Sequence, residues 1–262
     1  LGPHHPWVAQ SLSSLGGQLA LKTHYAEARP LYERALTIRE KALGPDHPTV
    51  ADTLMGFAWL LQQQADFAGA RALYERILKI RVRALGPDHA AVAHTLHDFA
   101  VLHGRMGDAA GAIAMHERAL RMREQALGPH HPWVAQSLSS LGGLLAGKTR
   151  YAEARPLLER ALGIREQALG PDHRDVADVL DDLGALSRET GDYSGARPLV
   201  ERALRIREQS FGPSHPAVAG SLSNLASLLR LTGDHASALP LLERALRIRE
   251  EALGPRHPQV AR

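Results

Sequence analysis

The segment Ala42-Leu43-Gly44-Pro45-Asp46-His47-Pro48 decides how this chain folds, because close copies of it recur along the whole sequence. Its central Gly-Pro pair opens the sequence at residues 2 and 3, and its glycine returns, each time followed by proline, at Gly86, Gly128, Gly170, Gly212 and Gly254. Successive glycines lie 42 residues apart, and no insertion or deletion interrupts the series. A fixed period of this size indicates structural repeats, each of which buries its apolar face against its neighbours.

The repeated segment has the residues that separate two helices. Gly44 can adopt the left-handed conformation that ends a helix, and Pro45 cannot continue that helix. Pro48 suits the first turn of the next helix, where Asp46 and His47 can accept hydrogen bonds from free N–H groups. A histidine recurs at this point in every copy, so we interpret these histidines as turn and cap residues without a catalytic role. They are His5, His47, His89, His131, His173, His215 and His257.

Between junctions, each repeat predicts two helices. Apolar residues from Val50 to Leu61 have helical spacing, which predicts a helix A over residues 48–64, and a second apolar stripe predicts a helix B over residues 67–84. The expected fold is therefore an all-α solenoid of antiparallel helix pairs, spanning residues 1–262 as one domain. The six full repeats are residues 1–42, 43–84, 85–126, 127–168, 169–210 and 211–252, followed by a partial seventh repeat at 253–262.

Small residues recur where the two helices of a pair must approach closely. They are Gly16, Ala58, Ala100, Gly142, Gly184 and Ala226 in helix A, matched in helix B by Ala28, Ala70, Ala112, Ala154, Ala196 and Ala238. A larger side chain at these positions would push the helices apart.

The composition excludes several classes of function. The chain has no cysteine, which excludes disulfides and thiolate metal sites, and its net charge of +3 argues against a nucleic-acid partner. No apolar run approaches membrane-spanning length and no signal-like segment opens the chain, so we expect no membrane partner and a cytoplasmic location. The chain starts at Leu1 without methionine and stops early in the seventh repeat, which suggests a monomeric segment of a longer protein.

The repeat pattern resembles a known family. The consensus LGPDHPxVAxxLxxLAxLLxxxGDYxxARPLxERALxIRE, most complete from Phe211 to Glu250, is similar to the 42-residue tetratricopeptide repeats of kinesin light chains and their relatives. This resemblance covers the whole chain. It implies a right-handed superhelix of helix pairs, in which the A helices line a concave groove that binds peptides or proteins.

The resemblance also selects the groove residues. By family alignment, and because they vary between repeats, we expect the ligand-binding groove to include Asp52, Met55, Trp59, His94, His97, Asp98, Gln136, Asp178, Asp181, Asp182, Asn224 and Arg230. Variation at exposed positions under relaxed selection is the alternative explanation.

Two places in this groove suggest what it binds. Trp59 beside Met55 offers an apolar anchor, unless the tryptophan packs between repeats. Asp181 and Asp182 lie in mid-helix, where aspartate is unfavourable, and they predict an acidic patch for a basic ligand. The asparagine by which kinesin light chains hold the backbone of a bound peptide is matched only by Asn224, which argues against acidic cargo peptides.

Two motifs could carry other chemistry. Residues 142–149, GGLLAGKT, fit the phosphate-loop signature, but the preceding residues have helical period where that loop needs a strand, so we interpret the match as coincidence. His94, His97 and Asp98 have the spacing to share one helix face and, with Asp52, could hold a divalent metal. The alternative is a polar groove wall with incidental histidines, and we predict neither a metal nor a cofactor.

The sequence therefore predicts a binding module for a protein or peptide partner, with no catalytic residues. One alternative is the sensor arm of a larger signalling enzyme, a nucleotide-switched ATPase or a protease, whose catalytic domain lies outside this segment. A second is a structural spacer whose exposed ends stack on one another.

Overall fold

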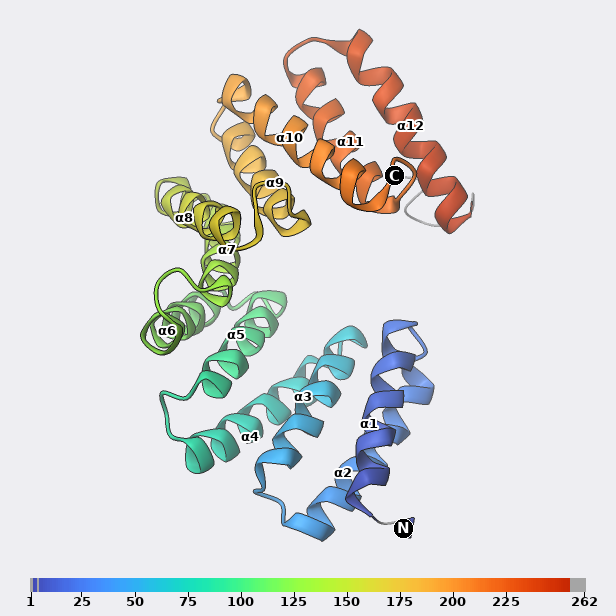
Figure 1. The fold of residues 1–262 in the computed structure, drawn as a ribbon, viewed down its shortest axis with the longest axis vertical. Helices are drawn as coiled ribbons and strands as arrows, with labels where there is room; N and C mark the ends of the chain where they lie inside the picture. Colours follow the sequence, from blue (N-terminus) through green and yellow to red (C-terminus); the bar gives the residue numbers. More distant parts are fainter. Residues whose placement is uncertain (1, 4, 255–262) are drawn as a thin grey trace. The chain divides into compact units, whose positions relative to one another are not determined.

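The computed structural model describes residues 2–3 and 5–254, and these residues form twelve α-helices joined by turns, with no β-strand among them (Figure 1). The helices are α1 (Pro6–Leu21), α2 (Tyr25–Leu43), α3 (Pro48–Gln63), α4 (Phe67–Leu85), α5 (Ala90–Arg105), α6 (Ala109–Leu127), α7 (Pro132–Ala146), α8 (Tyr151–Leu169), α9 (Arg174–Glu189), α10 (Tyr193–Phe211), α11 (Pro216–Leu231) and α12 (His235–Leu253). Odd-numbered helices are the A helices of the repeats, and even-numbered helices are the B helices.

Consecutive helices pack as antiparallel pairs, which confirms the predicted all-α solenoid class. Packing divides the chain into two compact units, residues 1–128 and 129–262, each with three helix pairs. Within a unit, each B helix also packs on the next A helix, as α2 does on α3 and α8 on α9. The single continuous domain stays a prediction, and the seventh repeat beyond Gly254 lies outside the described residues.

The junctions confirm the cap interpretation for the histidines. His47 precedes α3, and its Nδ1 accepts a hydrogen bond of 3.3 Å from the Thr49 N–H, while Pro48 is the first helical residue. The equivalent histidines cap α1, α5, α7, α9 and α11 in the same way, whereas His257 lies outside the described residues. Asp46 does not cap this helix, because its carboxylate pairs with Arg83 at 3.1 Å.

Gly44 ends α2 in a conformation that differs from the prediction. Its φ is positive, at 90°, but its ψ is 154°, so the residue is extended where a left-handed helical residue has ψ near 50°. This region of backbone space is essentially restricted to glycine. The junction therefore requires glycine more strictly than a left-handed cap would.

The turn between the A and B helices of a repeat also needs a positive φ. Three repeats use glycine there, at Gly107, Gly191 and Gly233, and the other three use Thr23, Ala65 and Thr149, with φ of 65°, 60° and 61°. A residue with a Cβ atom is strained in this conformation.

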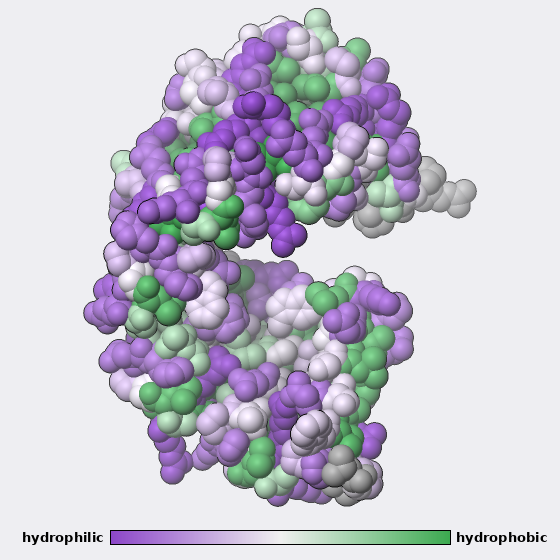
Figure 2. Space-filling view, viewed as in Figure 1, coloured by the Kyte–Doolittle hydropathy of each residue, from purple (hydrophilic) through white to green (hydrophobic). Residues whose placement is uncertain are grey.

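Each helix pair buries an apolar core between its two helices. In residues 1–128 this core includes Leu54, Tyr74 and Ile77, all at most 1% exposed. The first helix has an apolar face toward solvent, because Leu15 is 52% exposed while its counterpart Phe57 is buried (Figure 2). No helix among residues 5–254 combines the length and apolar character needed to cross a membrane.

The phosphate-loop match does not have the structure that such a loop needs. Gly142 to Ala146 form the last turn and a half of α7, and Lys148 and Thr149 lie in the turn that follows. A phosphate loop instead follows a strand and begins a helix, whose N–H groups face the phosphates. The end of α7 presents carbonyl oxygens, which repel an anion.

Candidate ligand-binding pockets between repeats

Three pockets lie at equivalent joints between repeats, each lined by one A helix and the next, with one pocket in the unit of residues 1–128 and two in the unit of residues 129–262. The Trp59 pocket, of about 340 Å³, is lined by Trp59, Gln62, Gln63, Tyr74, Asp98, Val101 and Arg105. The Asp182 pocket, of about 380 Å³, is lined by Gly143, Ala146, Gly147, Thr149, Tyr151, Leu158, Asp182, Ala185 and Glu189. The Asn224 pocket, of about 60 Å³, is lined by Asp181, Gly184, Ala185, Arg188, Val200 and Asn224.

The repeat explains why these pockets recur. One B-helix position supplies Tyr74, Leu158 and Val200 to the three pockets, and one position of the following A helix supplies Asp98, Asp182 and Asn224. The frame of each pocket is therefore the same, and the lining side chains differ. Within the unit of residues 129–262, the neighbouring Asp182 and Asn224 pockets can contact successive side chains of an extended ligand.

The pockets bring together five of the predicted groove residues, namely Trp59, Asp98, Asp181, Asp182 and Asn224. Trp59 is 37% exposed, so part of its indole is available to a ligand, while Met55 is half-buried and packs on the core. Gln136 and Arg230 are exposed on α7 and α11, but they do not line these three pockets.

An arginine near the end of the B helix engages three of the predicted groove residues, of which only Asp181 also lines a pocket. Arg81 pairs with Asp52 at 2.9 Å, and Arg207 pairs with Asp178 at 2.8 Å and with Asp181. Arg207 also donates to Ser221 of the next A helix, so it ties three helices together. Arg39, Arg81 and Arg165 likewise donate to a backbone carbonyl at the start of the next A helix, whereas Arg249 donates to Ser223 and the Ala219 carbonyl of the A helix in its own repeat.

These arginine contacts divide the predicted acidic patch. Asp181 is engaged by Arg207, whereas the neighbouring Asp182 makes no hydrogen bond or ion pair with any residue that the structure describes. Sequence reasoning missed the arginine's role, although its signal, an Ile-Arg or Met-Arg pair at the same place in every repeat, is present in the sequence.

The proposed metal ligands of repeat three do not meet. His97 is buried, and its ring packs edge-on against His116 with ring centroids 5.1 Å apart. His94 Nε2 lies 3.6 Å from Asp98 Oδ2, and Asp52 is held by Arg81. Among the residues that the structure describes, no three metal-binding side chains gather closely enough to hold an ion.

Burial makes the two histidines resist protonation. It lowers the pKa of His97 to about 3 and that of His116 to about 4, and the positive charge of the nearby Arg123 acts in the same direction. Both rings therefore stay neutral over the physiological range and act as packing groups. This places His97 in the repeat core and outside the groove surface.

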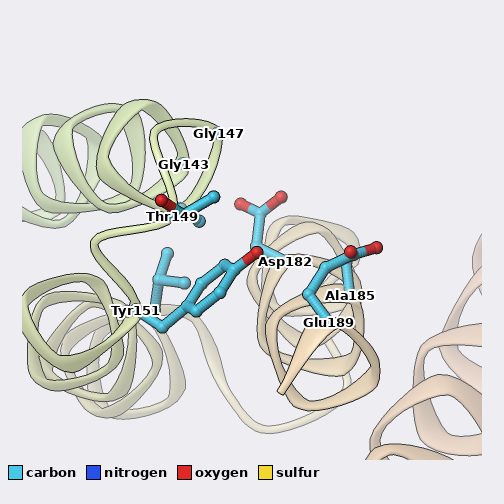
Figure 3. Close-up of a pocket in the computed structure, with 9 residues that line it drawn as sticks. Gly143, Gly147, Thr149, Tyr151, Asp182, Ala185 and Glu189 are labelled. Atoms are coloured by element: carbon cyan, nitrogen blue, oxygen red, sulfur yellow. The ribbon is translucent and has the colours of Figure 1, made fainter. Parts of the chain in front are cut away.

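Asp182 has the opposite shift. Partial burial, with the negative charges of Asp178 and Asp181, raises the pKa of Asp182 to about 6, while Arg165 and Arg207 act against this rise. Figure 3 shows the ring of Tyr151 extending from the start of α8 toward α9, from which Asp182 projects. The other acidic lining residue, Glu189, pairs with its neighbour Arg188 at 3.0 Å. Sequence reasoning missed Tyr151, Thr149 and Glu189 as pocket residues.

Comparison with known proteins identifies the family. The model of the tetratricopeptide repeat matches residues 7–81, 60–125, 100–167, 133–209, 185–251 and 217–262, which together cover nearly the whole chain. The chain therefore belongs to the tetratricopeptide repeat family, as the sequence pattern predicted. Such repeats generally act as protein-interaction scaffolds. A comparison with curated proteins found no match.

Solved structures with the same fold include kinesin-light-chain-like proteins. BtubC (BKLC) from P. vanneervenii is 24% identical with a TM-score of 0.71, and the match covers 94% of this chain and 91% of that one. A kinesin light chain-like protein of Podospora anserina with nearly identical repeats is 22% identical with a TM-score of 0.67, covering 79% and 98%.

A third similar structure is part of a larger protein. It is a signal transduction ATPase with numerous domains from Pyrococcus horikoshii, which has a tetratricopeptide repeat sensor. It is 16% identical with a TM-score of 0.70, and the match covers 95% of this chain but only 37% of that protein.

Proposed function

We propose that this chain is a non-catalytic binding module that holds an extended peptide segment of a protein partner along its A helices. The observation that carries the proposal is the series of equivalent pockets, in which the frame repeats and the lining changes from one repeat to the next. In the unit of residues 129–262, the Asp182 and Asn224 pockets lie at successive joints and select successive side chains of one ligand.

The Trp59 pocket supplies the apolar contact in this proposal. Its partly exposed indole lines the pocket together with Val101 and Tyr74, and large aromatic side chains in such places dominate binding energies. Asp98 and Arg105 also line this pocket and can orient a peptide through its polar groups.

Selection from a random-peptide phage library on the purified chain tests this function. The expected result is a family of related peptides whose binding falls roughly tenfold or more when Trp59 is changed to alanine, the loss expected for a hot-spot aromatic residue. Phe211→Ala is the matched control, because Phe211 is also 37% exposed but lies at the end of α10 and lines none of the three pockets. Failure to select any peptide family, or equal loss in both variants, would refute the proposal.

A second candidate is a sensor arm within a larger signalling protein. The structure of the Pyrococcus horikoshii ATPase favours it, because a chain of this fold serves there as the sensor. Reading the coding sequence on both sides of this segment tests the candidate. An adjoining nucleotide-binding or protease domain would support it, and a full-length reading frame without one would refute it.

A further inference from the structure

The Asp182 pocket is open because its walls lack side chains. A Cβ atom added at Gly143 would meet no atom within 4 Å, and Gly147 and Ala185 contribute little bulk on the two sides. The resulting cavity of about 380 Å³ is within the size range of small-ligand sites. A ligand can therefore enter the pocket past Gly143 and Gly147 without any movement of the helices.

The chain contains an internal comparison for this pocket, since repeats one and four are nearly identical. At the joint after repeat one, the ring of Tyr32 fills the space, and a Cβ at Gly56 would lie only 2.8 Å from that ring. At the joint after repeat four, the equivalents of Tyr32 and Gly56 are Leu158 and Asp182. The shorter side chain of Leu158 leaves room for the carboxylate, and the small lining residues Gly147 and Ala185 stand where the first joint has Leu21 and Trp59.

The charges around the pocket favour a cation. Among the described residues that line it, Asp182 and Glu189 carry the carboxylates and none has a basic side chain. The nearby guanidinium groups of Arg165 and Arg207 are engaged elsewhere, the first by the Asp175 carbonyl and the second by Asp178, Asp181 and Ser221. A partly buried carboxylate that pairs with no described residue, in a concave site, attracts a positively charged group.

The aromatic ring of Tyr151 favours a guanidinium group over other cations. Its ring lines the pocket beside Asp182, and a planar guanidinium can stack on an aromatic face while it donates two hydrogen bonds to a carboxylate. We propose that the Asp182 pocket binds the guanidinium of an arginine side chain. In the intact complex this arginine belongs to the partner peptide, and that part of the inference rests on the proposed function.

The direct probe is N-acetyl-arginine amide, which carries the side chain without a peptide. Titrating it into the isotope-labelled chain should produce saturable chemical-shift changes at the backbone amides of Gly143 and Gly147. N-acetyl-citrulline amide has nearly the same shape without the charge, and it should produce no saturable change there. Equal responses to the two compounds, or changes confined to other parts of the chain, would overturn the proposal.

Two variants and a control give the test its specificity. Asp182→Asn keeps the shape and removes the charge, and it should weaken binding of the arginine amide by about fivefold, as expected for one partly exposed ion pair. Gly143→Leu should abolish binding by filling the cavity. Gly163→Leu is its matched control, because Gly163 is also helical with no atom within 4 Å of an added Cβ, but it lies on α8 outside the pocket. Undiminished binding by Gly143→Leu would contradict the assignment.

The pH supplies a further readout. The carboxylate must be ionised to hold the guanidinium, so affinity for the arginine amide should rise as the pH increases through about 6. Asp182→Asn should remove this rise. Because these experiments use no peptide, a negative result would leave the peptide-binding function to be judged separately through Trp59.

Discussion

Gly142 and Gly143 are adjacent in α7, yet their replacement by alanine should change stability in opposite directions. Either substitution removes a glycine from a helix interior, which by itself stabilises the fold by about 0.5–1 kcal/mol. At Gly143 nothing opposes this gain, because the new methyl group enters open space. We therefore expect Gly143→Ala to be the more stable variant by about that amount.

At Gly142 the added methyl group would overlap the core. Its carbon would lie 2.8 Å from Cγ and 2.9 Å from Cδ2 of Leu158, a branched side chain of the repeat core with no exposed surface. Carbon atoms normally approach to about 3.5–4 Å, and overpacking of this kind costs about 1–3 kcal/mol. After subtraction of the helix gain, Gly142→Ala should destabilise the chain by roughly 1 kcal/mol.

Thermal unfolding followed by circular dichroism can separate the two variants. A difference of about 2 kcal/mol between them corresponds to roughly 4–8 °C in midpoint for a chain of this size. Repeat two has an Ala58–Tyr74 pair where repeat four has Gly142–Leu158, so the double variant Gly142→Ala/Leu158→Tyr should lose less stability than the sum of its single changes. Equal midpoints for the two alanine variants would refute this account of helix packing.

Three further predictions follow from strained, buried or charged groups. Ala65→Gly should stabilise the chain by about 1 kcal/mol, measured by urea unfolding, because it relieves a φ of 60° at a residue with a Cβ; no gain would contradict the strain. Arg207→Met should lower the free energy of unfolding by about 2–3 kcal/mol, because the side chain of Asp181 that it leaves unpaired is only 17% exposed. Arg81→Met should lower it distinctly less, because the side chain of Asp52 is 63% exposed. The pKa of His97 falls from 6.5 to about 3 on folding, so its contribution to stability is complete above pH 6.5 and is lost as the pH falls toward 3. His97→Met should therefore flatten the acid side of the stability profile, and an unchanged profile would show that the ring is not buried as described.

Much of the fold could be predicted from the sequence because the same helix-pair pattern occurs in all six full repeats. The fixed Gly-Pro period located the helix pairs, and the predicted helices at 48–64 and 67–84 differ from the observed Pro48–Gln63 and Phe67–Leu85 by one residue each. The histidine caps followed from their position before the first helical turn.

The backbone conformation of the turns was harder to predict from the sequence. The extended ψ of Gly44 depends on how the next repeat docks, and the positive φ at Thr23 and Ala65 contradicts the local preference of those residues. Sequence propensity favours glycine at such places, and three of the six repeats do use it. Packing of the helix pair decided the conformation in the other three.

The sequence predicted that the candidate site lies on the A helices, but it did not predict which of their side chains line the pockets. Asp181 and Asp182 are adjacent in sequence, but successive helical residues point about 100° apart. Asp181 therefore meets Arg207, from the following B helix, and lines the Asn224 pocket, whereas Asp182 faces the other way and lines the Asp182 pocket. His97 was placed in the groove, whereas its ring packs against His116 inside the repeat. Both outcomes depend on partners that are distant in sequence, which helical spacing alone does not reveal.

The central claim is that the A-helix pockets hold a peptide of the partner. The most direct test is a map of backbone amide chemical shifts in the labelled chain, recorded with a peptide from the phage selection. The account predicts that the largest changes fall at the pockets, at Val101 and Asp98 in repeat three and at Ala185 and Asp182 in repeat five. Changes confined to the exposed B-helix residues, such as Glu75 and Glu159, would contradict it.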